Sequence, residues 1–118
     1  MDPTPYTVSF DRSGANLTIY LSGELDDDTV RSLREQLLPH VHRTDERVWV
    51  DLAAVTFCGS AGLTFFVRLD ELVSANGGRL TLYRPSRQVM RSICLCGLDR
   101  FLSISQPRSQ PSSSGQLV

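Results

Sequence analysis

The sequence predicts an α/β fold in which a mixed, mostly parallel sheet of about five strands is layered with helices, in the order β-β-α-β-α-β-α-β. Two patterns indicate this class. Strand-like and helix-like segments alternate after residue 25, and two strand-like segments precede the first helix. A chain of 118 residues forms one domain, which we expect to span residues 6–105.

The two opening strands are expected at residues 6–10 and 17–21, where apolar and polar residues alternate. The polar residues 11–14 between them form a turn, so the strands make an antiparallel hairpin at one edge of the sheet.

The first helix is expected to begin at residues 26–29, where acidic and capping side chains suit a helix start. Pro39 lacks an N–H group and should end the helix near Leu38. The apolar residues at helical spacing are Val30, Leu33, Leu37 and Val41.

A central strand is predicted at residues 47–52, continuing to 57, and a second helix follows the small residues 58–62 until Asn76 and two glycines stop it. Its apolar face is expected to consist of Phe65, Phe66, Leu69, Leu72 and Val73.

The last third of the domain should contain a strand at 79–83, a helix from 85–86 to Gly97 and an edge strand at 101–104. The helix should bury one face made of Val89, Met90, Ile93 and Cys94. Residues 1–5 are expected to be flexible, and the Ser-, Pro- and Gln-rich residues 106–118 to be a disordered tail.

Charge and composition exclude several classes of function. A net charge of -1 gives no general attraction to nucleic acid or to an anionic membrane. The amino terminus lacks the features of a secretory signal, and the apolar-rich stretch 63–73 is too short and too charged to span a bilayer. Three cysteines form no disulfide framework, so the expected location is cytoplasmic.

The junction at residues 58–63 is the most informative segment for function. It lies where a buried strand gives way to a helix, which is where ligands of open α/β sheets gather. Ser60 should sit at or near the N-cap. Two interpretations stay open: Ser60 is only a helix cap, or it is presented to a protein kinase, where a phosphate would add about -1.5 to -2 charges.

From Leu17 to Ile104 the chain resembles a STAS domain, and in particular the stand-alone anti-sigma factor antagonists. The residues that carry this resemblance are the runs SGELD at 22–26, VDL at 50–52, VTF at 55–57, GSAGL at 59–63, GGRL at 77–80 and CGLD at 96–99.

The resemblance implies a STAS-type layered fold and a set of site residues. Ser60 matches the family's phosphoacceptor, and Asp26 matches an acidic residue close to it. The partner-binding residues implied are Asp26, Gly59, Ala61, Gly62 and Leu63. One position departs from the motif, because Gly59 stands where the family has an acidic residue.

The implied partner is an anti-sigma factor with a histidine-kinase-like ATPase domain, which acts as a protein serine kinase. The unphosphorylated form binds this partner, phosphorylation at Ser60 ends the interaction, and a serine phosphatase restores it. The chain itself is then not an enzyme and needs no cofactor or metal.

Two alternatives from other classes stay open: an accessory subunit of a membrane transport complex, and a module that senses a nucleotide or another small ligand near Asp26 and Ser60. A hydrolase is disfavoured because the G-x-S-x-G spacing is not met and because the only histidines, His40 and His42, follow the first helix with no evident route to Ser60. The Cys94-x-Cys96 pair lacks zinc spacing and indicates packing in the core and a turn.

Overall fold

The computed structural model describes residues 6–106 and has the predicted element order. The predicted flexible residues 1–5 and all of the predicted tail except Gln106 lie outside this range. The elements are β1 (Tyr6–Ser13), β2 (Asn16–Leu25), α1 (Asp27–Leu37), the 3-10 helix η1 (Leu38–His40), β3 (Arg47–Cys58), α2 (Ser60–Ala75), β4 (Arg79–Tyr83), α3 (Arg87–Leu95), the 3-10 helix η2 (Leu98–Arg100) and β5 (Ser103–Ser105).

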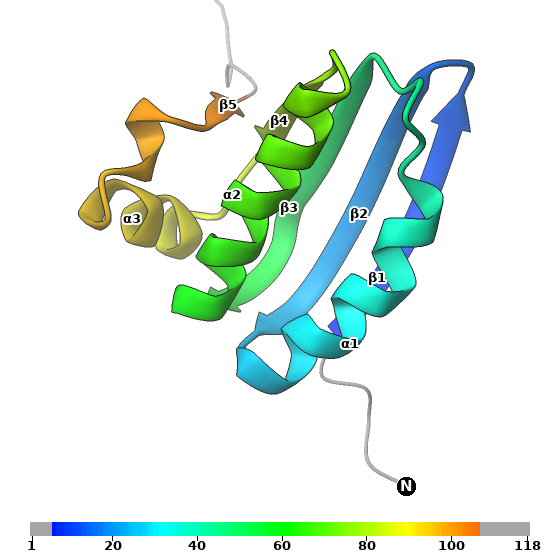
Figure 1. Cartoon of the computed structure of the whole chain (residues 1–118). Helices are drawn as coiled ribbons and strands as arrows, with labels where there is room; N and C mark the ends of the chain where they lie inside the picture. The colour runs from blue at the N-terminus through cyan, green and yellow to red at the C-terminus, as the bar shows by residue number, and fades with distance from the viewer. Residues whose placement is uncertain (1–5, 107–118) are drawn as a thin grey trace, which may run out of the picture.

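The five strands form one sheet in the order β1-β2-β3-β4-β5. β1 pairs antiparallel with β2, and every other neighbouring pair is parallel. The α/β class, the edge hairpin and the edge position of the last strand are therefore confirmed. Helices α1 and α2 lie side by side over one face of the sheet (Figure 1).

The two faces of the sheet differ in chemistry because side chains alternate along each strand. The face under the helices carries the core, and the side chains of Ile19, Val50 and Leu82 in its three central strands are fully buried. The other face carries polar and aromatic side chains that stay partly exposed, among them Thr18, Tyr20, Trp49, Thr81 and Tyr83.

Helix α1 begins and ends as its sequence predicts. The Asp26 carboxylate accepts from the backbone N–H groups of Asp28 and Thr29, and the Thr29 hydroxyl accepts in return from the Asp26 N–H. This reciprocal arrangement satisfies donors that a helix start leaves free. Pro39 lies in η1, directly after the end of α1 at Leu37.

Four local expectations were wrong. The turn expected at 11–14 consists only of Gly14 and Ala15, because β1 continues in register with β2 as far as Ser13. Leu72 is 41% exposed because it lies at the margin of the buried face of α2, about 20° beyond Phe65 at 100° per residue. Cys94 is exposed because α3 buries a narrow stripe of Val89 and Ile93. Phe101 is 76% exposed, and β5 begins only at Ser103.

Candidate functional site

Ser60 is the first residue of α2, at the point where β3 ends. The N-cap is Gly59, which has no side chain to cap the helix, and the Gly59 N–H donates to the carbonyl of Leu25 at 3.0 Å. The interpretation of Ser60 as a helix cap is therefore wrong: its exposed hydroxyl is free of that role. The N–H groups of the first turn have no partner within the helix.

Gly62 and Leu63 anchor the start of α2 in the core. A Cβ atom on Gly62 would lie 2.6 Å from the Cys58 sulfur and 3.1 Å from the Leu25 Cβ, so only glycine lets the helix approach this closely. Leu63 is 5% exposed. Both residues were predicted to bind a partner. Their burial means that any such role acts mainly by positioning Ser60 and the partly exposed Ala61.

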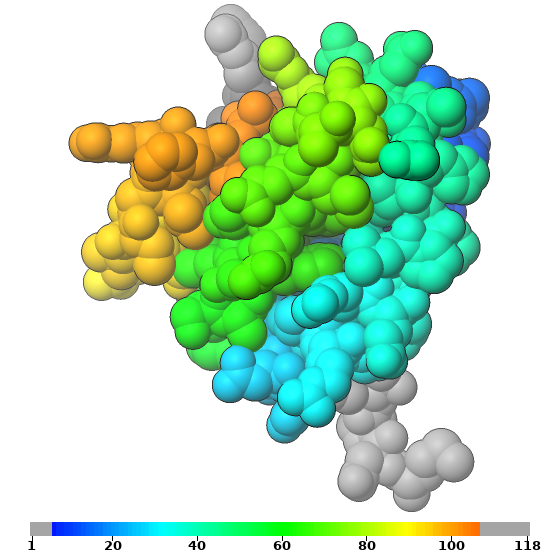
Figure 2. All heavy atoms as spheres, viewed as in Figure 1, coloured from blue at the N-terminus to red at the C-terminus, as the bar shows by residue number. Residues whose placement is uncertain are grey.

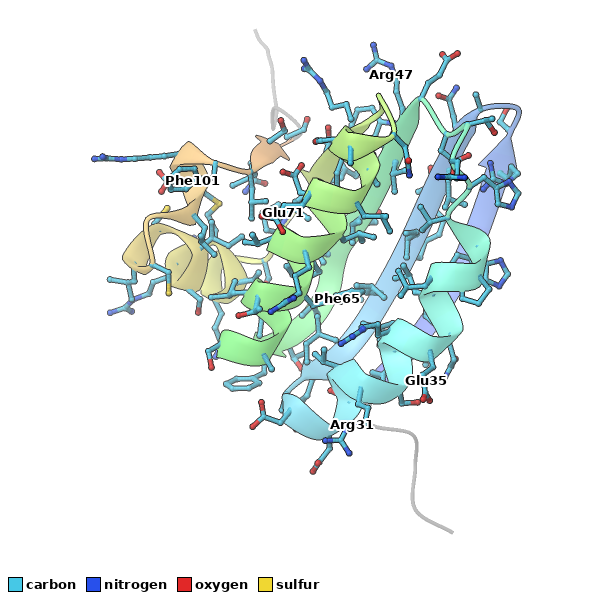
Figure 3. All side chains as sticks on the ribbon, in the orientation of Figure 1. Arg31, Glu35, Arg47, Phe65, Glu71 and Phe101 are labelled. Atoms are coloured by element: carbon cyan, nitrogen blue, oxygen red, sulfur yellow. The ribbon has the colours of Figure 1, made fainter. Side chains whose placement is uncertain are left out.

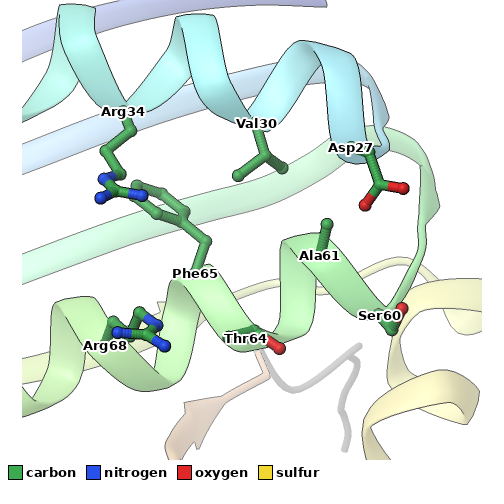
Figure 4. A pocket seen from close by; sticks show the side chains of 8 residues that line it. All are labelled: Asp27, Val30, Arg34, Ser60, Ala61, Thr64, Phe65 and Arg68. Atoms are coloured by element: carbon green, nitrogen blue, oxygen red, sulfur yellow. The ribbon is translucent and has the colours of Figure 1, made fainter.

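Two acidic residues at the start of α1 have different tasks. The Asp26 carboxylate is occupied by the helix cap, and its hydrogen bonds with the backbone of Thr29 are the main reason that its pKa is lowered. Asp27 instead faces the start of α2, where it lines a groove together with Ser60 (Figure 4). Asp27 is thus the carboxylate that faces Ser60, in the place that the family resemblance had implied for Asp26.

The groove beside Ser60 runs between α1 and α2 and has a volume of about 280 Å³. Figure 2 shows the two helices next to each other on one face of the molecule, α1 in cyan and α2 in green. The residues that line the groove are Asp27, Val30 and Arg34 of α1, and Ser60, Ala61, Thr64, Phe65 and Arg68 of α2.

A second hollow, of about 260 Å³, lies on the other side of Ser60. Its lining is mostly apolar and consists of Ser60, Leu63, Thr64, Val67, Cys96 and Leu98. Ser60 and Thr64 line both hollows, so these two hydroxyls stand on a ridge between them. A partner that contacts Ser60 can therefore fill a hollow on either side.

The two histidines lie apart from this ridge, whereas the exposed Cys96 lines the second hollow and Cys58 is buried beneath the start of α2. His40 stacks on Phe10 with ring centroids 3.8 Å apart, and neither His40 nor His42 lines the two hollows. Burial raises the pKa of the Cys58 thiol to about 12. Within residues 6–106 no three His, Cys, Asp or Glu side chains gather in a way that could hold a metal ion.

The chain is similar to several known proteins in sequence and in fold. A family profile described as "Mlab, STAS domain" matches residues 8–104. The anti-sigma-B factor antagonist of Bacillus subtilis (strain 168) is 31% identical over 91 residues, which cover 76% of this chain and 82% of that protein.

Solved structures have the same fold. An anti-sigma factor antagonist from Mycobacterium paratuberculosis superposes with a TM-score of 0.76 at 25% identity, covering 88% of this chain and 87% of that one. The antagonist SpoIIAA in its unphosphorylated form superposes with a TM-score of 0.73 at 19% identity, covering 87% of this chain and 90% of that one. SpoIIAA in its phosphorylated form superposes with a TM-score of 0.67 at 18% identity, covering 87% of this chain and 93% of that one.

The chain belongs to the STAS domain family. Within that family its relatives are anti-sigma factor antagonists, whose names describe regulators rather than enzymes. No helix in the described part of the chain has the length and apolar character needed to cross a membrane.

Four residues that line the groove together with Ser60 were not predicted from the sequence: Asp27, Arg34, Thr64 and Arg68. A signal existed for two of them, because Thr64 and Arg68 follow Ser60 at intervals of four along one helix and therefore share its face. The α1 residues had no such signal, since only the packing of α1 against α2 brings them near.

Proposed function

We propose that this protein is an anti-sigma factor antagonist that binds a kinase-type anti-sigma factor when unphosphorylated and is released by phosphorylation of Ser60. The observation that carries the proposal is the position of Ser60, an exposed hydroxyl at the first residue of α2 with a hollow on each side. A relative with the same fold, SpoIIAA, is known in both an unphosphorylated and a phosphorylated form.

The physical effect of the phosphate follows from its surroundings. It would add about -1.5 to -2 charges at the amino end of α2, where free N–H groups and the helix dipole stabilise negative charge. The isolated domain therefore tolerates the modification. A docked partner has to bury that charge next to the Asp27 carboxylate, so the complex loses affinity while the fold stays intact.

The absence of a carboxylate at position 59 affects phosphorylation more than binding. A side chain there would lie beside the acceptor hydroxyl, and Gly59 offers only backbone. In this proposal the partner's ATPase domain supplies the nucleotide and the catalytic groups, in the cytoplasm, and a serine phosphatase reverses the reaction. We expect phosphoryl transfer to be slower than in a Gly59→Asp variant.

The test is intact-mass spectrometry after incubation with ATP and each purified histidine-kinase-like anti-sigma factor of the source organism. We expect one added phosphate that is lost in Ser60→Ala and kept in Thr64→Ala, the matched control one helical turn away. Ser60→Glu should weaken the complex, although one carboxylate carries less charge than a phosphate.

The other outcomes are equally informative. A stable complex without phosphate would leave an antagonist that binds constitutively and would overturn the switch. With neither phosphate nor complex, the transport-subunit alternative would lead, and co-purification with a transporter ATPase would be the next measurement. Saturable nucleotide binding in equilibrium dialysis would favour the sensor alternative.

A further inference from the structure

The groove between α1 and α2 has a positively charged part that the switch at Ser60 does not use. Arg34 of α1 and Arg68 of α2 both line it, and both are exposed. Within residues 6–106 neither guanidinium forms an ion pair or a side-chain hydrogen bond; the salt bridges there join Arg12 to Asp45 and Arg84 to Asp51. Figure 4 shows Arg34 beside the ring of Phe65, with Arg68 one helical turn along α2 from Thr64.

The two arginines are at the opposite end of the groove from Ser60. Ser60, Thr64 and Arg68 follow one another at intervals of four on α2, so Arg68 lies about 12 Å along the helix from Ser60 at 1.5 Å per residue. Between the two ends the floor is apolar and is formed by Val30, Ala61 and Phe65. The groove therefore has an acidic end at Asp27, an apolar middle and a basic end.

We propose that this groove receives an acidic segment of the partner anti-sigma factor, with Arg34 and Arg68 as the residues that select it. This inference rests on the proposed function, because a partner that reaches Ser60 covers the adjoining groove. Covering two guanidiniums removes them from water, which is costly unless the partner supplies acceptors. Carboxylates are the matching acceptors, because a guanidinium binds them through paired hydrogen bonds.

The geometry also fixes where that segment lies on the partner. Its carboxylates should be about 12 Å from the phosphoryl group that is transferred to Ser60, given the helical rise of α2. An apolar side chain between those points should rest on Phe65 and Ala61.

The test compares two double variants that change the net charge equally. Arg34→Glu/Arg68→Glu reverses the charge at the basic end of the groove. Arg47→Glu/Arg79→Glu reverses the charge of two exposed arginines that lie opposite each other where β3 and β4 begin. These two arginines are at the end of the sheet away from the start of α2 (Figure 3). Each is titrated by calorimetry against the purified histidine-kinase-like anti-sigma factor that binds the wild type, and urea unfolding verifies that both are folded.

We expect the groove variant to lose about tenfold or more in affinity and the control to stay within about twofold of wild type. The loss should shrink between about 0.05 and 0.5 M salt, because salt screens the long-range attraction between the two oppositely charged surfaces before they are in contact. Equal affinity of the two variants for the anti-sigma factor would overturn the acidic-segment proposal. If Ser60→Glu still bound this partner more weakly than the wild type, the proposed function would stand.

The same groove could instead hold a small anion, and a second titration separates the two cases. Inorganic phosphate and ATP are added to the unbound protein, with binding followed by NMR shifts of the α2 amides. Saturable binding that disappears in Arg34→Glu/Arg68→Glu would overturn the proposal in favour of a small-anion site. Absence of such binding, together with the affinity loss above, supports it.

Discussion

The sulfur of Cys58 occupies the space that a Cβ atom on Gly62 would need, at a distance of 2.6 Å. This contact joins the last residue of β3 to the first turn of α2, and it sets the position of the exposed Ser60 between them. The orientation of the proposed switch residue therefore depends on two small residues, one before it and one after it, that pack against each other.

Gly62→Ala should lower the free energy of unfolding by about 1–2 kcal/mol, because overpacking outweighs the gain in helix propensity. The cost should fall when Cys58→Ala removes the sulfur, leaving only the Leu25 contacts at 3.1 and 3.3 Å. Urea unfolding of the wild type, both single variants and the double variant measures this coupling. If the changes in unfolding free energy of the two single variants simply added up in the double variant, the helix would shift freely and the contact between Cys58 and Gly62 would be unimportant.

Gly59→Asp should stabilise the protein by a few tenths of a kcal/mol, because a carboxylate at the N-cap accepts from the free N–H groups of α2. The tightest contact of a Cβ at this position is with the ring of the exposed Phe57, at 3.3 Å, and that ring can move. The backbone oxygen of Leu25, at 3.8 Å, is at an ordinary contact distance. Thermal unfolding would detect the gain, and Gly59→Ala is the control without an acceptor. A lower Tm for Gly59→Asp than for Gly59→Ala would contradict the cap geometry.

Asp26→Ala should mainly lower stability, whereas Asp27→Ala should mainly change the binding of the anti-sigma factor. Asp26→Ala removes the cap of α1 and should lower the midpoint of urea unfolding. Asp27→Ala leaves that midpoint almost unchanged but should alter the affinity of the anti-sigma factor, because Asp27 faces the groove beside Ser60. If only Asp26→Ala changed binding among folded variants, the roles assigned to the two aspartates would be reversed.

Asp45 should make stability depend on pH in acid. Its buried carboxylate accepts from both terminal nitrogens of Arg12, at 2.6 and 3.1 Å, and from the His42 N–H, and the Arg12 hydrogen bonds are the main reason that its pKa is lowered. A lowered pKa in the folded state gives stability that is present above the unfolded value of about 3.9 and is lost as the pH falls below it.

Asp45→Asn should therefore flatten the decline in unfolding free energy between about pH 5 and pH 3 relative to wild type. Chemical unfolding at several pH values provides the measurement. Asp99→Asn, at an exposed aspartate without an ion pair among residues 6–106, is the matched control. An unchanged slope in Asp45→Asn would show that Asp45 does not govern the acid response.

The three thiols should react at different rates. Cys94 and Cys96 are exposed, whereas Cys58 is buried with a pKa raised to about 12. Because the thiolate is the reactive species, iodoacetamide at pH 8 should label Cys94 and Cys96 in the folded protein and Cys58 only after unfolding. Peptide mass spectrometry identifies the labelled sites. Rapid labelling of Cys58 under native conditions would indicate that the β3–α2 junction opens.

The sequence by itself determined the order of the elements and the chemistry around Ser60. Strands and helices follow from the periods of two and 3.6 residues that backbone geometry imposes on local segments, and the runs of residues around Ser60 indicated the STAS family. Even within α1, the Asp26 cap could be predicted because it depends on residues only three positions apart.

The tertiary structure decided which of these residues are accessible and which lie together. Leu72 and Cys94 fit a helical apolar face in sequence, yet they lie at its margins, because the width of the buried stripe depends on what packs against it. Arg34 and Arg68 share a groove only because α1 and α2 lie side by side on the sheet. Contacts between segments so distant in sequence depend on packing, which no local periodicity encodes.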